Sequence, residues 1–196
     1  MNCAELQRTL FNKMKRDVHL LKKVSEILSG TFNLTHQYLG RAKWDELIFD
    51  FIRNDKYSGH SIFDIHLSFY RYLSRKRDNL LKDLILFEYS IIELFYLNDL
   101  PKPSLEPHFI ALIPEHRLLT FTYPIYKFKT DELFQQKGTY HLYLFRNPST
   151  FTIEMVEVSS RYFNFLKKIS KSPVIHKGRS AFLNNLYQQG GLLKWT

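Results

Sequence analysis

The residues whose chemistry could support metal binding or catalysis are scattered along this sequence. Among the eight histidines, His60 with Asp64 and His116 with Glu115 have the spacing of half a metal site. Neither pair is accompanied by further ligands, and a closed or catalytic metal site needs more donors than a single pair supplies. The sequence therefore predicts no metal ion and no cofactor in this chain.

Groups suited to covalent or nucleotide chemistry are missing as well. The only cysteine, Cys3, lies near the N-terminus with no histidine beside it, whereas a reactive thiolate needs a base or a cation nearby. The glycines form no phosphate-binding loop, and neither GxSxG nor HExxH occurs. We expect a chain that is not itself an enzyme. A single cysteine also rules out an internal disulfide, which favours a reducing, cytoplasmic location.

One carboxylate stands out because the helical pattern places it among apolar residues. Glu88 shares a face with Leu84, Ile91 and Ile92. An unpaired carboxylate is costly to bury, so we expect a cationic or backbone partner for Glu88. A direct functional role for this side chain remains the alternative.

The first half of the chain has the apolar periodicity of helices. We expect an amphipathic helix over 4–28 with Gly30 as its C-terminal cap, and a second helix that begins near Thr35. The longest helical stretch, 61–97, predicts a hairpin that starts with a capping box at Ser61 and Asp64 and is interrupted by SRKRDN. Together these elements predict a helical bundle.

The pattern changes beyond residue 98, where three prolines follow closely. We therefore expect a helical domain over 1–98, a proline-rich linker over 99–107 and a second, smaller domain over 108–196. Period-two segments at 118–123, 139–146 and 151–158 predict strands, the last two as a β-hairpin. Two helices follow, the first capped by Ser159 or Ser160 and the second by Ser180. The predicted fold class is α+β, a helical bundle followed by a β-hairpin and winged-helix-like domain.

Three segments of the helical region carry a family resemblance. YLGRAKWDELIFDFIRND, HSIFDIHLSFYRYL and LLKDLILFEYSIIELF resemble the helical domain of the HvfC/BufC group, two-domain proteins named for DNA binding. The resemblance covers residues 38–97 best. Within the group, the short chain and the FYRYL segment look most like the MbnC-type partner proteins of methanobactin biosynthesis, a copper-acquisition pathway.

That resemblance implies a function without chemistry of its own. Such a protein forms a heterodimer with an iron-dependent TIM-barrel enzyme of the MbnB type, and the iron belongs to the enzyme. It helps to present a ribosomally made precursor peptide of the MbnA type for modification of its cysteines. Which precursor peptide is handled and which face meets the enzyme are not implied.

A second resemblance concerns the C-terminal end. FLNNLYQQGGLL is similar to the closing segment of PqqD-like peptide-recognition domains. It implies a peptide groove between the strand at 151–158 and the helix at 180–189, with two basic side chains near an acidic peptide end. The same apolar residues could instead be ordinary core. The candidate peptide-binding residues are Phe151, Ile153, Met155, Phe182, Leu186, Tyr187, Lys177 and Arg179.

The charge balance leaves one other class of function open. The formal net charge is +9, which attracts nucleic acid, an acidic peptide or an acidic protein surface. The basic residues are spread out and form no long basic run. With the helix-turn-helix outline of the C-terminal part, they make a DNA-binding regulator the alternative to a peptide-binding partner, which would not bind nucleic acid or a membrane.

Overall fold

The computed structural model describes residue 19 and residues 21–54, 62–97, 108–127, 136–175 and 180–194. It confirms the α+β class, with a helical N-terminal region and antiparallel sheets that follow it. The chain divides into two compact units, Met1–Tyr89 and Ser90–Thr196, so the second unit is not the smaller one. The division falls inside helix α4, Asn79–Tyr96, because the last turns of that helix belong to the same unit as the strands. The linker predicted at 99–107 lies outside the described residues.

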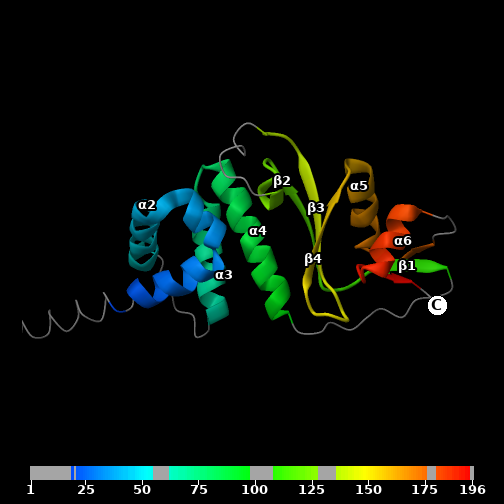
Figure 1. Cartoon of the computed structure of the whole chain (residues 1–196), viewed down its shortest axis with the longest axis horizontal. Helices are drawn as coiled ribbons and strands as arrows, with labels where there is room; N and C mark the ends of the chain where they lie inside the picture. Colours follow the sequence, from blue (N-terminus) through cyan, green and yellow to red (C-terminus); the bar gives the residue numbers. More distant parts are fainter. Residues whose placement is uncertain are drawn as a thin grey trace, which may run out of the picture. The chain divides into compact units, whose positions relative to one another are not determined.

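The first unit contains helices in the order that the sequence predicts. Residues 21–31 are helical, and α2 (Asn33–Asn54), α3 (Ile62–Ser74) and α4 follow (Figure 1). The helical hairpin is confirmed as α3 and α4. Asp78 caps α4, since its carboxylate accepts the N–H groups of Leu80 and Leu81 at 2.9 and 3.1 Å. Ser61, the first residue of the predicted capping box, is outside the described residues.

An aromatic cluster forms the core of this unit. Phe69, on α3, is fully buried, and its ring lies 5.2 Å from Phe32, 5.5 Å from Trp44 and 5.2 Å from Phe51, centroid to centroid. These tilted and edge-on arrangements are the ones that aromatic quadrupoles favour. The three partners come from α2 and the residue before it, so a single side chain of α3 packs against both ends of α2.

Two glycines behave differently from the sequence prediction. The first helix does not end at Gly30, because Thr31 is still helical and its hydroxyl donates to Ile27 O at 2.6 Å. Inside α2, Gly40 has φ 70° and ψ 162°, and the helix is kinked there. This backbone conformation is accessible to glycine and strained for other residues. The sequence pattern predicted no such break.

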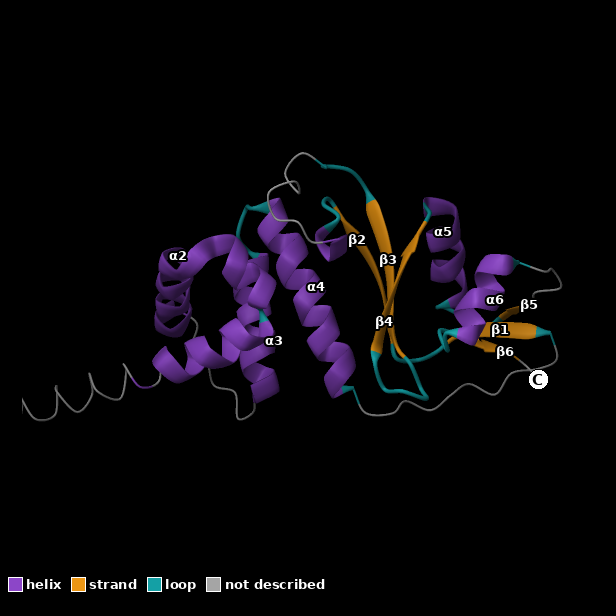
Figure 2. Cartoon of the chain, in the orientation of Figure 1, coloured by secondary structure: helices purple, strands orange, loops and turns teal. Residues whose placement is uncertain are grey.

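The second unit contains two antiparallel sheets of three strands, and all described strands belong to it (Figure 2). One sheet has the order β2-β3-β4, and the β3–β4 pair is the hairpin that the sequence predicts. The other has the order β5-β1-β6 and was not predicted as a sheet. The strands are β1 (Phe109–Leu112), β2 (His116–Phe121), β3 (Tyr140–Arg146), β4 (Ile153–Val158), β5 (Val174–Ile175) and β6 (Leu192–Lys194).

Two helices share a core with both sheets. They are α5 (Ser160–Ile169), capped by Ser159, and α6 (Ala181–Gln188), capped by Ser180 as predicted. Between them lies β5, which pairs with β1, so a strand separates the two helices where a short turn was expected. A short 3₁₀ turn, Ile125–Lys127, follows β2. The shared core comprises Ile110, Leu112, Ile113, Tyr143, Phe145, Val158, Phe163, Leu166, Ile169, Leu183, Leu186 and Leu192.

Candidate peptide-binding site

The strand side of the predicted site lies along the open edge of a sheet. Within the described residues β4 pairs only with β3. Phe151, in the turn before β4, is 59% exposed and Met155 is 50% exposed, while Ile153 is half-buried. Three of the predicted peptide-binding residues therefore lie together at the margin of this edge strand.

The hydrogen-bond pattern shows which backbone groups face away from β3. Asn147 donates to Thr152 O at 2.8 Å, so these two residues form a hydrogen-bonded pair. Because hydrogen-bonded and non-bonded pairs alternate in an antiparallel ladder, the N–H and C=O groups of Ile153, Met155 and Glu157 point to the open edge. Ile153 and Met155, which belong to the predicted peptide-binding residues, thus have outward-facing backbone groups.

The helix side of the predicted site lies elsewhere. Leu186 is 1% exposed and belongs to the core that also contains Val158 and, at its margin, Val156. Side chains alternate along a strand, so Ile153 and Met155 lie on the opposite face of β4 from these valines. The structure therefore does not form the groove predicted between β4 and α6. The prediction placed the wrong face of β4 toward α6, because both faces carry apolar residues.

The remaining predicted residues are also apart from the β4 edge. Phe182 is half-buried and stacks on Tyr162 of α5, with ring centroids 4.0 Å apart. Tyr187 is exposed on α6. Lys177 and Arg179 lie outside the described residues, so their predicted position near a peptide end stays a prediction.

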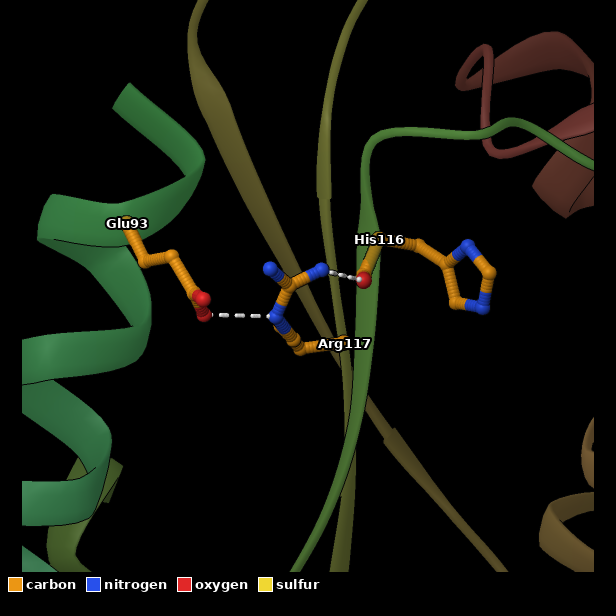
Figure 3. A network of polar contacts seen from close by, with 3 residues as sticks. All are labelled: Glu93, His116 and Arg117. Carbon is orange, nitrogen blue, oxygen red and sulfur yellow. Dashed lines mark hydrogen bonds and ion pairs between the residues drawn. The ribbon is translucent and has the colours of Figure 1, made fainter. Parts of the chain in front are cut away.

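The sheet face that carries Ile153 and Met155 is tied to the end of α4 by arginines that the sequence analysis missed. Arg117 Nε donates to Glu93 Oε2 at 2.7 Å, and Arg117 Nη1 donates to His116 O at 2.6 Å (Figure 3). Arg146, the strand partner of Ile153, donates to Leu97 O at 2.7 Å. Strand alternation could have placed Arg117 on this face with Leu119, but nothing in the sequence indicates its partner on α4.

The His116 side chain points away from Arg117 (Figure 3). Its Nδ1 lies 2.7 Å from Ile113 O, and a carbonyl can only accept, so Nδ1 carries the proton. Burial lowers the pKa of His116, which keeps the ring neutral. Within the described ranges, no third metal-binding side chain joins His116 and Glu115, and no other cluster of such side chains occurs.

Glu88 has a backbone partner, one of the two kinds that the sequence predicts. It is 5% exposed, and its carboxylate accepts Leu34 N–H at 2.6 Å, Thr35 N–H at 3.1 Å and the Thr35 hydroxyl at 2.6 Å. These N–H groups belong to the first turn of α2, so a side chain of α4 caps α2. Burial raises the pKa of Glu88 to about 7, although the hydrogen bonds from Thr35 and Leu34 act in the opposite direction. This arrangement accounts for Glu88 without a functional site.

Comparison with known proteins does not assign the chain to a family. No protein-family model matches the sequence, and a search of the curated proteins finds no match. Among the helices of the described residues, none combines the length and the apolar character needed to cross a lipid bilayer.

Proposed function

We propose that this chain is a non-catalytic, cytoplasmic partner subunit of a peptide-modifying complex of the methanobactin type. It binds the leader of a precursor peptide and docks on a TIM-barrel oxygenase that holds several iron ions and modifies the peptide's cysteines. The resemblance of residues 38–97 to the HvfC/BufC group suggests the complex, and the open edge of β4 supports the peptide-binding part.

The observation that carries the proposal is the coincidence of free backbone groups and apolar side chains along β4. An extended peptide can add to a sheet edge, where main-chain hydrogen bonds give affinity and alternate side chains give selectivity. Ile153 and Met155 offer both, because their N–H and C=O groups and their side chains are available at the same positions. Phe151 extends the apolar margin at the start of the strand.

The geometry also restricts the side chains that the peptide would use. A strand added beside β4 continues the alternation of the sheet, so every second peptide side chain lies on the face with Ile153 and Met155. That face also carries the buried residues Leu142 and Leu144 of β3. We expect the leader to place apolar residues at alternate positions there.

The complex is tested by co-expression with a TIM-barrel iron enzyme of the MbnB type, followed by chromatography with light scattering and iron analysis. We expect a one-to-one heterodimer that contains iron, and an iron-free chain when it is expressed alone. Iron binding or peptide turnover by the chain alone would contradict the proposal. Separate elution, with salt-sensitive retention of this chain on DNA, would favour a DNA-binding regulator.

The edge itself is tested with two variants at one position. Met155→Pro removes the outward N–H, and Met155→Ala removes only the side chain beyond Cβ. Proline is tolerated on edge strands, so both variants should keep their circular dichroism spectra. We expect leader-peptide affinity to fall by about tenfold or more in Met155→Pro and by only a few fold in Met155→Ala. Equal affinity of Met155→Pro and the unchanged chain would exclude strand addition at β4.

A further inference from the structure

A second surface of the same unit lies between α5 and α6, which lie beside each other (Figure 1). A pocket of about 490 Å³ is lined there by Arg161, Tyr162 and Phe165 of α5 and by Phe182 and Leu183 of α6, among others. Its walls are mainly aromatic and aliphatic, and its volume suits one or two side chains of a partner. The stacked pair of Tyr162 and Phe182 forms one wall of the pocket.

The segment of the chain that lines this pocket carries charge of one sign. From residue 159 to residue 196 every charged side chain is a lysine or an arginine, and the sequence contains no aspartate or glutamate there. Arg161, Phe165 and Lys168 follow one another at helical spacing, so both cations flank the pocket-lining Phe165 on one face of α5. Both are exposed, and neither takes part in the ion pairs formed among the described residues.

We propose that the α5–α6 pocket docks an acidic segment of a protein partner. An apolar side chain of that segment enters between Phe165 and Phe182, and neighbouring carboxylates pair with Arg161 and Lys168. A surface with charge of one sign attracts and orients a segment with charge of the opposite sign. The apolar pocket favours a protein segment over nucleic acid, since a phosphate backbone is bound by cations arranged along a stripe.

This surface is separate from the proposed peptide edge. The core side chains of α5 and α6 pack on the face of the β2-β3-β4 sheet that carries Tyr143 and Val158, whereas Met155 lies on the other face. Docking at this pocket is therefore independent of peptide binding at β4. A variant at Met155 and a variant at Arg161 should affect different ligands.

The test is a selection of short random peptides, displayed on yeast, for binding to the full chain at low salt. We expect the enriched peptides to contain an aromatic or leucine residue flanked by aspartate and glutamate. A synthetic copy of the strongest binder is then titrated into purified variants and followed by fluorescence anisotropy. A selection that enriches no acidic peptide overturns the proposal.

Three variants locate the binding. Arg161→Glu reverses an exposed charge and should weaken the peptide by about tenfold. Phe182→Ala should weaken it by at least about tenfold through loss of the apolar contact, with its fold checked by circular dichroism. Lys43→Glu makes the same charge change at an exposed position of α2 and should stay within about twofold. Unchanged affinity in Arg161→Glu overturns the proposal, as does an oligothymidylate that binds the same pocket more tightly than the peptide does.

Discussion

Two glutamates on α4 show how differently the two units use a carboxylate. Glu88, in the first unit, is buried and accepts hydrogen bonds only from neutral groups of Leu34 and Thr35. Glu93, in the second unit, is 30% exposed at its side chain and pairs with the cation Arg117. The first must overcome a large desolvation cost, and the second is screened by water. Removal of Glu88 would leave buried donors unpaired, so Glu88 should matter more for stability, although it has no ion-pair partner among its described contacts.

The largest effect should follow from removing the buried carboxylate. Glu88→Leu leaves the N–H groups of Leu34 and Thr35 without their acceptor, and we expect a loss of about 4 kcal/mol in the free energy of unfolding of the first unit. Urea unfolding measures this through the fluorescence of Trp44, in a background where Trp195 is replaced by phenylalanine. The matched variant Glu93→Leu should cost about 1 kcal/mol. Equal losses in the two variants would remove the distinction between the glutamates.

A smaller effect should appear in the pH dependence of the first unit. The pKa of Glu88 rises from 4.5 to about 7 on folding, so its contribution is fully present below pH 4.5 and is lost as pH rises through 7. We expect the free energy of unfolding to fall by about 3 kcal/mol over this interval, relative to Glu88→Gln. Urea titrations at several pH values measure the difference.

The comparison with Glu88→Gln is needed because a second buried group titrates in the same unit. Burial lowers the pKa of His66, so that histidine adds stability as pH rises toward 6.5 and opposes the effect of Glu88. The contribution of His66 is the same in both proteins and cancels in their difference. A difference that does not change with pH would contradict a raised pKa for Glu88.

The smallest effect should be the salt dependence of the half-buried pair of Glu93 and Arg117. Glu93→Gln should lower the stability of the second unit by about 0.5 kcal/mol at low salt and by less at high salt, because partly exposed charges are screened. Hydrogen exchange at the Leu142 and Leu144 amides of β3 measures it. If Glu88→Gln showed the same salt dependence in the first unit, burial would not be what separates the two carboxylates.

The elements that the sequence predicted are those with strong local patterns. The α3–α4 hairpin, the β3–β4 hairpin and the caps at Ser159 and Ser180 follow from apolar periodicity and from the preference of serine for helix starts. A partner for Glu88 was also predicted, as either a cation or a backbone group, because the cost of burying a carboxylate requires one.

The candidate site was predicted only in part, because it depends on tertiary packing. Both faces of β4 carry apolar residues, so the sequence did not show whether Met155 or Val156 faces α6. The sheet β5-β1-β6 joins strands of two to four residues that lie far apart in the chain, and segments this short carry no clear period. The Glu93–Arg117 pair links a helix to a strand and has no signature in the sequence.

The cap that Glu88 supplies to α2 also determines when the first unit can complete its fold during translation. Thr35 and Glu88 are 53 residues apart, so α2 leaves the ribosome long before its acceptor has been translated. A nascent chain that ends before α4 must leave the first N–H groups of α2 to water. Closing this contact requires the long segment between the two residues to be ordered, and the logarithm of the folding rate falls as that entropic cost rises. The first unit can therefore reach its native state only after translation has passed residue 88.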